Sequence, residues 1–452
     1  MSAGGGPERQ PPPAPSAPSA VDAVTDLMVA ANATAVERLC SADPVLVDVR
    51  PAIEVVPGLT PSTILTSGPP LPWSAYTGGQ RNGILGGALF EGLAPDAAEA
   101  EAMLGDGRIR VAPCHDHGCV GSLAGIYTAS MPVFIVDNRA VGNRGFCNLF
   151  EGPSPARLNY GIYNAEVRRS LLFIRDVVGP TLGAAVRALG GIALRPLMRR
   201  ALQMGDELHS RNTAATLLFG RELFPVLLDL ARDRPGPVRQ LVEYLTSDYV
   251  FLRLSMAASK VTADAAHDIE GTSVVTAMAF SCRDFGIRVS GLGAEWFRAP
   301  VPAVQARLFP GYTPDDIEVM GGESVINETV GLGGFAQAAA FALQDYQGGS
   351  VEGMVDLNRA MYAITLAPHP EFRIPYLGFQ GTPTGIDIHR VVSTGILPAM
   401  DIGVAGRKGG QIGAGVLRAP LGCFADAVEA YRTRYGPAGV SRPRADARAA
   451  RP

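Results

Sequence analysis

Lysine is almost absent from this chain of 452 residues, in which Lys260 and Lys408 are the only two and arginine supplies the remaining positive charge. A GxxxxGK[ST] segment, which a Walker-type nucleotide site requires, does not occur. An anionic substrate would therefore have to be bound by arginine side chains, with their paired N–H donors, and by backbone N–H groups at the starts of helices.

Long apolar runs and paired cysteine motifs are missing as well. No run of eighteen or more apolar residues occurs, and the first residues lack the basic-then-apolar order of a signal peptide, so we expect a cytoplasmic protein without a membrane partner. None of the six cysteines stands in a CxxC pair, which leaves reduced thiols as the expectation. A net charge of −4 gives no indication of the basic surface that nucleic-acid binding needs.

The length, together with a hydrophobic fraction of 47% and a charged fraction of 18%, indicates a well-buried multidomain protein. Hydrophobic periodicity predicts a mixed α/β or α+β fold, with a central all-helical domain and glycine-rich strand–loop regions. Helices are also predicted over residues 335–344 and 351–366. The expected divisions are a disordered Pro/Ala/Gly tail over 1–20, an α/β domain over 21–160, the helical domain over 161–265, an α+β domain over 266–430, and a disordered tail over 431–452.

A short segment between two strand-like runs, residues 112–121, holds a third of the histidines and a third of the cysteines. Its side chains Cys114, His115, His117 and Cys119 are of the types that act as nucleophiles, proton carriers and metal ligands. Neighbouring residues of an extended loop point in opposite directions, so Cys114 and His115 cannot easily bind one ion together. We therefore favour a loop that lines an anion or carbonyl site, with a metal loop or a simple polar connection as the alternatives.

A second polar cluster interrupts the long helices of the middle third at residues 204–212. Asp206 and His209 share a helical face, as do Glu207 and Arg211, and Asn212 follows directly. A solvated helix start with an i,i+4 ion pair is one interpretation. The long apolar helices on either side favour the other, a functional cluster.

Glycine-flanked polar segments form a third group, and such loops present bare N–H groups to carboxylate, phosphate or carbonyl oxygens. With Glu323, Asn327 and Glu328 nearby in the sequence, they suggest a site assembled from several domains. The segment 331–334 does not match GxGxxG, so a Rossmann dinucleotide site lacks its fingerprint. The segments are 142–144, 288–293, 331–335 and 381–387.

An ordered series of motifs across about residues 21–430 resembles the YlbE-type family, which includes the AllG subunit of the oxamate carbamoyltransferase of allantoin utilisation. The motifs are Val47-Asp48-Val49-Arg50-Pro51, Gly87-Ala88-Leu89-Phe90-Glu91-Gly92, residues 112–121, Ser130-Met131-Pro132-Val133, Gly142-Asn143-Arg144, residues 203–212, 286–293 and 331–335, Arg373-Ile374-Pro375 and residues 381–387.

The resemblance implies a cytoplasmic, multidomain α+β protein that works with an FdrA-like subunit and a further small subunit in purine (allantoin) catabolism. We also expect an oligomer and no cofactor. The implied reaction moves a carbamoyl group between oxalurate and phosphate, giving oxamate and carbamoyl phosphate. The Pro/Ala tail departs from the strand-rich start expected of the family, at a place that bears on the partner interface. The Ser-Thr-Arg-Thr phosphate loop of aspartate and ornithine carbamoyltransferases is absent, so their residue roles do not transfer.

The chemistry needs cations for anionic groups, a donor for the carbonyl oxygen and a group that moves a proton. We predict no bound metal. Two alternatives to the transferase remain: a structural or regulatory subunit whose chemistry lies on a partner chain, and a metal-dependent amidohydrolase. The predicted catalytic residues are His115 or His117 for proton transfer, Cys114 as an alternative nucleophile, and His209 oriented by Glu207 or Asp206; the predicted substrate-binding residues are Arg144 and Arg211 for anions, Asn143 and Asn212 for a carbonyl, and Gly333, Thr382 and Thr384 from the glycine-rich loops.

Overall fold

The computed structural model describes residues 20–436, with side chains from residue 24 onward. Helix α15 runs over Leu421–Tyr435, so the chain is helical past the start predicted for the C-terminal tail at 431. The rest of that tail and the predicted N-terminal tail, apart from Ala20, lie outside the described residues. The predicted class, a multidomain mixed α/β fold, is confirmed.

A five-stranded sheet forms the N-terminal core, in the order β4 (Cys119–Val120), β6 (Arg144–Asn148), β5 (Pro132–Asn138), β1 (Pro44–Pro51), β7 (Ile192–Ala193). Its neighbours are antiparallel except for β4 and β6. Beside it lie α1 (Ala20–Ser41), α2 (Ala52–Val55), the parallel pair β2 (Thr63–Thr66) and β3 (Arg110–Pro113), α3 (Gly78–Phe90) and α4 (Ala97–Gly105).

Helix α10 (Val250–Ala265) packs across β5 and β6 and is apolar around almost its whole circumference, as a helix in a protein interior must be. Strand β5 reads as a continuous apolar run for the same reason, because both of its faces are covered. Two buried residues of this helix carry a positive charge: Arg253 and Lys260. The helix therefore brings two cations into the interior.

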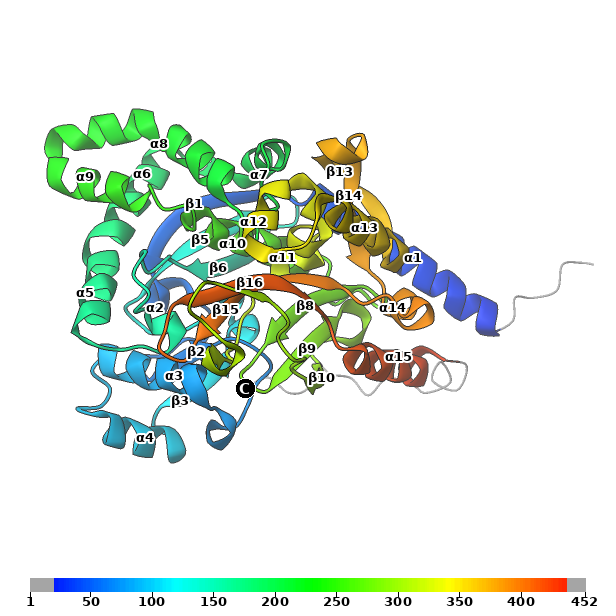
Figure 1. Ribbon diagram of the computed structural model, residues 1–452, viewed down its shortest axis with the longest axis horizontal. Helices are drawn as coiled ribbons and strands as arrows, with labels where there is room; N and C mark the ends of the chain where they lie inside the picture. Colours follow the sequence, from blue (N-terminus) through cyan, green and yellow to red (C-terminus); the bar gives the residue numbers. More distant parts are fainter. Residues whose placement is uncertain (1–19, 437–452) are drawn as a thin grey trace, which may run out of the picture.

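The central helices are α5 (Ala165–Phe173), α6 (Gly179–Ala188), α7 (Leu194–Gln203), α8 (Thr213–Asp233) and α9 (Pro235–Tyr244), with a π-helical turn over Ile174–Val178. Figure 1 shows α8 and α9 together at one end of the molecule, with α1 and α15 toward the other. The buried residues of α6, α7 and α8 share one apolar cluster with those of β1, β5 and α10. This region packs onto the sheet and is not all-helical, because β7 pairs with β1 inside it.

The C-terminal part has its own apolar cluster beneath two further sheets. One is β10 (Phe297–Pro300), β9 (Asp284–Val289), β8 (Val275–Phe280); the other is β11 (Arg307–Leu308), β16 (Gln411–Arg418), β15 (Ala399–Gly406), β12 (Ile317–Glu318). The hairpin β13 (Thr365–Ile374) and β14 (Gln380–Ile386) and the helix α14 (Ile388–Thr394) complete this part.

The helix predicted over residues 335–344 is wrong. The chain forms three successive 3₁₀ turns over Gly333–Phe335, Gln337–Ala339 and Phe341–Leu343 before the short helix α12 (Gln344–Gln347), and α11 before them is a single turn over Ile326–Thr329. Side chains from elsewhere take the place of helical hydrogen bonds here, since Asn358 accepts from the Ala338 N–H. The helix predicted over 351–366 ends at Met361, as α13 (Val351–Met361), because β13 begins at Thr365.

Candidate functional site

A cavity of about 150 Å³ lies where the start of α10, the 150–160 segment, the loop before α8 and strand β15 meet. Arginine, tyrosine, serine and histidine side chains reach it together with apolar ones. Such a concave site with a few convergent polar groups is the usual form of a small-molecule site. The polar side chains used below are Arg157, His209, Arg253, Ser324 and Asp401.

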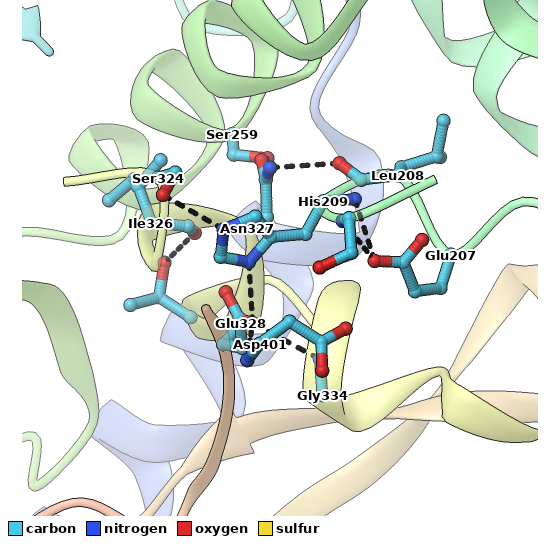
Figure 2. Close-up of polar contacts among 12 residues, drawn as sticks. Glu207, Leu208, His209, Ser259, Ser324, Ile326, Asn327, Glu328, Gly334 and Asp401 are labelled. Atoms are coloured by element: carbon cyan, nitrogen blue, oxygen red, sulfur yellow. Dashed lines mark hydrogen bonds and ion pairs between the residues drawn. The ribbon is translucent and has the colours of Figure 1, made fainter. Parts of the chain in front are cut away.

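His209 connects a serine and a glutamate at the edge of this cavity. Its Nε2 lies 2.8 Å from Ser324 Oγ, and its Nδ1 lies 2.8 Å from Glu328 Oε1 (Figure 2). Burial lowers the pKa of His209, whereas the Glu328 carboxylate raises it, and the net pKa lies above the usual histidine value. An imidazole fixed in this way between a hydroxyl and a carboxylate is equipped to transfer protons.

The loop that carries His209 is held in one conformation by its own side chains. The Glu207 carboxylate accepts hydrogen bonds from the backbone N–H groups of His209, Ser210 and Arg211. Leu208 has a φ of 71°, which is unusual for a side chain of this size, and its carbonyl accepts from Ser255 and Asn327. Backbone strain of this kind persists only where the surroundings fix it, and it gathers at functional sites.

The interpretation of residues 204–212 as a solvated helix start is wrong. Helix α8 does begin at Thr213, but Asp206 and Glu207 are fully buried and His209 and Asn212 almost so. Asp206 accepts from the Ala215 N–H in the first turn of α8, and Asn212 donates to the His209 carbonyl. The polar residues are therefore partners of the loop and the helix, and their cost of burial is offset by hydrogen bonds.

Three buried carboxyl groups surround His209: Glu207, Glu328 and Asp401. Burial and the neighbouring Asp401 raise the pKa of Glu207 well above its usual value. Burial and the neighbouring Glu328 raise the pKa of Asp401 to about 7. Carboxylates this close cannot all ionise at neutral pH, so the cluster holds a proton beside His209.

Two arginines line the same cavity, and the buried Glu151 carboxyl is the acidic group whose pKa both of them lower. Arg253, with 4% of its surface exposed, donates to Asn148 at 3.2 Å, and Arg157 stacks over the rings of Phe150 and Tyr160. The Nε atoms of both arginines are buried and lack a hydrogen-bond partner. Neither forms an ion pair within 4.0 Å among residues 20–436. One buried carboxyl group thus faces two guanidinium groups, Arg253 buried and Arg157 half-buried, and an anionic ligand in the cavity would balance the remaining charge.

The cysteine and histidine side chains of the predicted Cys/His loop are buried, but none of them lines this cavity. His115 Nδ1 lies 3.1 Å from Lys260 Nζ, and burial together with Lys260 lowers its pKa well below the usual value. His117 Nδ1 lies 2.7 Å from the Pro57 carbonyl oxygen. Burial raises the pKa of the Cys114 thiol well above its usual value, which disfavours a thiolate nucleophile.

The predicted anion and carbonyl ligands are dispersed. Arg144 forms a bidentate pair with Asp137 on the neighbouring strand, with half of its side chain exposed, and Asn143 donates to the Val261 carbonyl. Arg211 donates to the Gly205 carbonyl and lies 3.5 Å from Asp206. None of these side chains is among those that line the cavity.

Of the predicted residues, the structure brings His209, Glu207 and Gly333 together. Gly333 donates to the Glu207 carbonyl and has a φ of 55°, and a Cβ at this position would overlap the Glu328 carboxylate. Only glycine therefore lets the chain pass so close to Glu328. Thr382 and Thr384 are buried around Gly331, outside the cavity lining.

Sequence reasoning missed Ser324, Asp401 and the two cavity arginines as site residues, and noted Glu328 only as a neighbour. One signal was available for Arg253, which stands in the otherwise apolar run Val250-Phe251-Leu252-Arg253-Leu254. A charged side chain in such a run is rarely buried unless another group pairs with it. No comparable signal marks Ser324 or Asp401, because their proximity to His209 arises only in the folded chain.

Two further features concern the whole described region. Among residues 20–436, no group of three or more histidine, cysteine or acidic side chains is arranged to hold a metal ion, so the amidohydrolase alternative gains no support there. None of the helices that the structure describes has both the length and the apolar character needed to cross a membrane.

Comparison with known proteins places this arrangement in a family. A family model described as oxamate carbamoyltransferase subunit AllG matches residues 109–324. The oxamate carbamoyltransferase subunit AllG of Escherichia coli K12 is 40% identical over 412 residues, 90% of this chain and 98% of that protein. The uncharacterized protein YahG of the same organism is 42% identical over 416 residues, 91% of this chain and 88% of that protein.

A solved structure agrees with both relatives. The crystal structure of a conserved protein of unknown function from Enterococcus faecalis V583 matches with a TM-score of 0.87 and 38% sequence identity, over 92% of this chain and 99% of that one. The family resemblance carried by the sequence motifs is thereby confirmed, and the chain belongs to the AllG family.

Proposed function

We propose that this protein is a subunit of an oxamate carbamoyltransferase of allantoin utilisation and that its cavity is the site of carbamoyl transfer. The reaction moves a carbamoyl group between oxalurate and phosphate, giving oxamate and carbamoyl phosphate. An FdrA-like subunit and a further small subunit complete the enzyme. The name of the AllG relative supports the reaction, while the similar identity to the uncharacterized YahG means that the family alone does not select a substrate.

The observation that supports this proposal is that His209 and two arginines, neither of which forms an ion pair within 4.0 Å among residues 20–436, line one cavity. Oxalurate carries a carboxylate and its co-substrate is phosphate, so the transfer needs two anions side by side. Arg157 and Arg253 offer two planar sets of N–H donors, which suit carboxylate and phosphate oxygens. His209, fixed by Glu328, is the proton carrier beside them.

The bond changes require one proton transfer in each direction of the reaction. In oxalurate phosphorolysis, a phosphate oxygen forms a bond to the carbamoyl carbon and the C–N bond to the oxamate part breaks. The proton of the attacking hydrogen phosphate ends on the departing amide nitrogen. His209 is placed to accept a proton from an attacking oxygen and to give a proton to the departing nitrogen, which is general base and then general acid catalysis.

The test is activity of the purified chain, alone and after co-purification with its partner subunits. With carbamoyl phosphate and oxamate as substrates, the complex should form oxalurate and release phosphate. Replacing His209 in this chain should abolish the turnover of the complex. A complex that keeps full turnover with the His209 variant would place the chemistry on a partner and leave this chain a structural or regulatory subunit.

A further inference from the structure

Ser324 carries the one hydroxyl that contacts the His209 ring among the described residues. It stands at the entrance to α11, is half-buried, and lines the cavity beside His209 and Asp401. The reaction of the preceding section needs only a proton carrier. The carbamoyl transfer proposed above therefore assigns no role to the Ser324 hydroxyl.

The hydrogen bonds around Glu328 determine which nitrogen of His209 donates and which accepts. Glu328 Oε1 accepts the backbone N–H groups of Gly334 at 3.1 Å and Asp401 at 2.9 Å, so this oxygen is an acceptor (Figure 2). Nδ1 of His209 must then donate to it. In the neutral imidazole the other nitrogen, Nε2, has a lone pair, and it accepts the proton of Ser324 Oγ–H. A serine that donates to an imidazole which in turn donates to a carboxylate is the arrangement of an activated nucleophile.

The backbone that leads into Ser324 is fixed by hydrogen bonds at the two preceding residues. Gly322 exchanges two backbone hydrogen bonds with Phe280, at 2.8 and 2.9 Å. The buried Glu323 carboxylate accepts the N–H groups of Gly68 at 3.0 Å and Gly121 at 2.8 Å. Because the carboxylate of Glu323 ties the loop to two other segments, Ser324 is held in place before any substrate binds.

We propose that Ser324 is a catalytic nucleophile that carries the carbamoyl group as a carbamate ester between the two substrates; this inference rests on the proposed function. Ser324 Oγ attacks the carbamoyl carbon of carbamoyl phosphate, and its proton passes to His209 Nε2. The C–O bond to phosphate breaks, and the departing phosphate takes that proton. The amide nitrogen of oxamate then attacks the carbamate ester, gives a proton to His209, and the C–Oγ bond breaks as Ser324 recovers its proton.

A two-step transfer through Ser324 allows a partial reaction without the second substrate. The complex, incubated with carbamoyl phosphate and radiolabelled inorganic phosphate but no oxamate, should incorporate label into carbamoyl phosphate. Ser324→Ala should lower both this exchange and oxalurate formation at least about a thousand-fold, as the loss of a nucleophilic serine does. The control is Ser393→Ala, at an exposed serine of α14 that bonds only to the Arg390 carbonyl, and it should change neither rate.

A second measurement is independent of the natural substrates. An aryl carbamate should release its phenol when mixed with the complex, and mass spectrometry should find one added carbamoyl group on the peptide that contains Ser324. Labelling of Ser324 without any transfer to oxamate would refute the proposed function and keep the nucleophile. Normal transfer by a folded Ser324→Ala complex, with its melting temperature unchanged, would refute the nucleophile and keep the proposed function. The nucleophile would also be refuted if neither carbamoyl phosphate nor the aryl carbamate left a carbamoyl group on Ser324.

Discussion

Two buried histidines, His209 and His115, differ in the charged group at Nδ1: a carboxylate at His209 and an ammonium group at His115, whose Nε2 lies 3.9 Å from Glu323 Oε1. His209 contacts the Glu328 carboxylate and has a raised pKa, whereas His115 contacts the Lys260 ammonium group and has a pKa held well below the usual value by burial and by that charge. Both rings are almost fully buried. One of them reaches a cavity and the other does not.

The difference shows that the group bonded to a buried histidine decides whether the ring can gain and lose a proton. Nδ1 of His115 can only accept the Lys260 proton, so the ring is fixed as a neutral imidazole, and Lys260 itself is paired with Asp264 at 2.8 Å. Trp296 packs against the same ring in a T-shaped arrangement. His115 therefore acts as a structural bridge between the N-terminal region and α10, while His209 keeps the capacity to gain and lose a proton.

The largest expected effect separates the two histidines directly. His209→Asn should lower kcat of the complex about a thousand-fold, within the range that general acid–base catalysis contributes. His115→Asn should lower the melting temperature, because Lys260 loses one of its two acceptors, and should leave kcat within about ten-fold of the parent. Steady-state kinetics and thermal unfolding of both variants make the measurement. The reverse ranking of the two kcat values would return the active site to the Cys/His loop.

Next in size is the effect of the carboxylate behind His209. Glu328→Gln should lower kcat about a hundred-fold, because an amide no longer stabilises the imidazolium ring. Glu328 raises the pKa of His209, so the pH midpoint assigned to this histidine in the kcat/KM profile should lie above pH 6.5 in the parent and fall in the variant. A midpoint that stays where it was would mean that another group titrates. The control is Glu371→Gln, which removes a half-buried ion pair with Arg195.

The fold and the site were not equally predictable from the sequence. Apolar periodicity finds β1 and α10 because burial acts on each element locally. The 3₁₀ turns over residues 333–343 were not predicted, because they depend on hydrogen bonds with distant residues such as Asn358. The His209 loop could be found from its unusual density of polar residues. Its partners Ser324 and Asp401 lie more than a hundred residues away in the sequence, and no local pattern indicates a contact that tertiary packing creates.

The arginines give a smaller contrast of the same kind. Arg144 was a predicted anion ligand, but Asp137 already occupies two of its donors, whereas Arg253 lines the cavity. Arg253→Lys keeps the charge near Glu151 and loses the planar donors, so affinity for carbamoyl phosphate should fall ten- to a hundred-fold, about 1.5 to 3 kcal/mol. Arg144→Lys should leave affinity unchanged. Isothermal titration of both variants measures this, and a loss only in Arg144→Lys would restore the original assignment.

The smallest effect concerns stability and tests whether the carboxyl cluster holds a proton. Burial and Glu328 raise the pKa of Asp401 to about 7 in the folded chain, whereas an aspartate in the unfolded chain titrates near pH 4. The protonated group therefore adds stability that is fully present below pH 4 and is lost as the pH rises through about 7. Asp401→Asn cannot ionise and should lose less stability than the parent between pH 4 and 8 in denaturant unfolding. Parallel curves for the two proteins would show that Asp401 is ionised throughout, and the proton would then have to reside on Glu207.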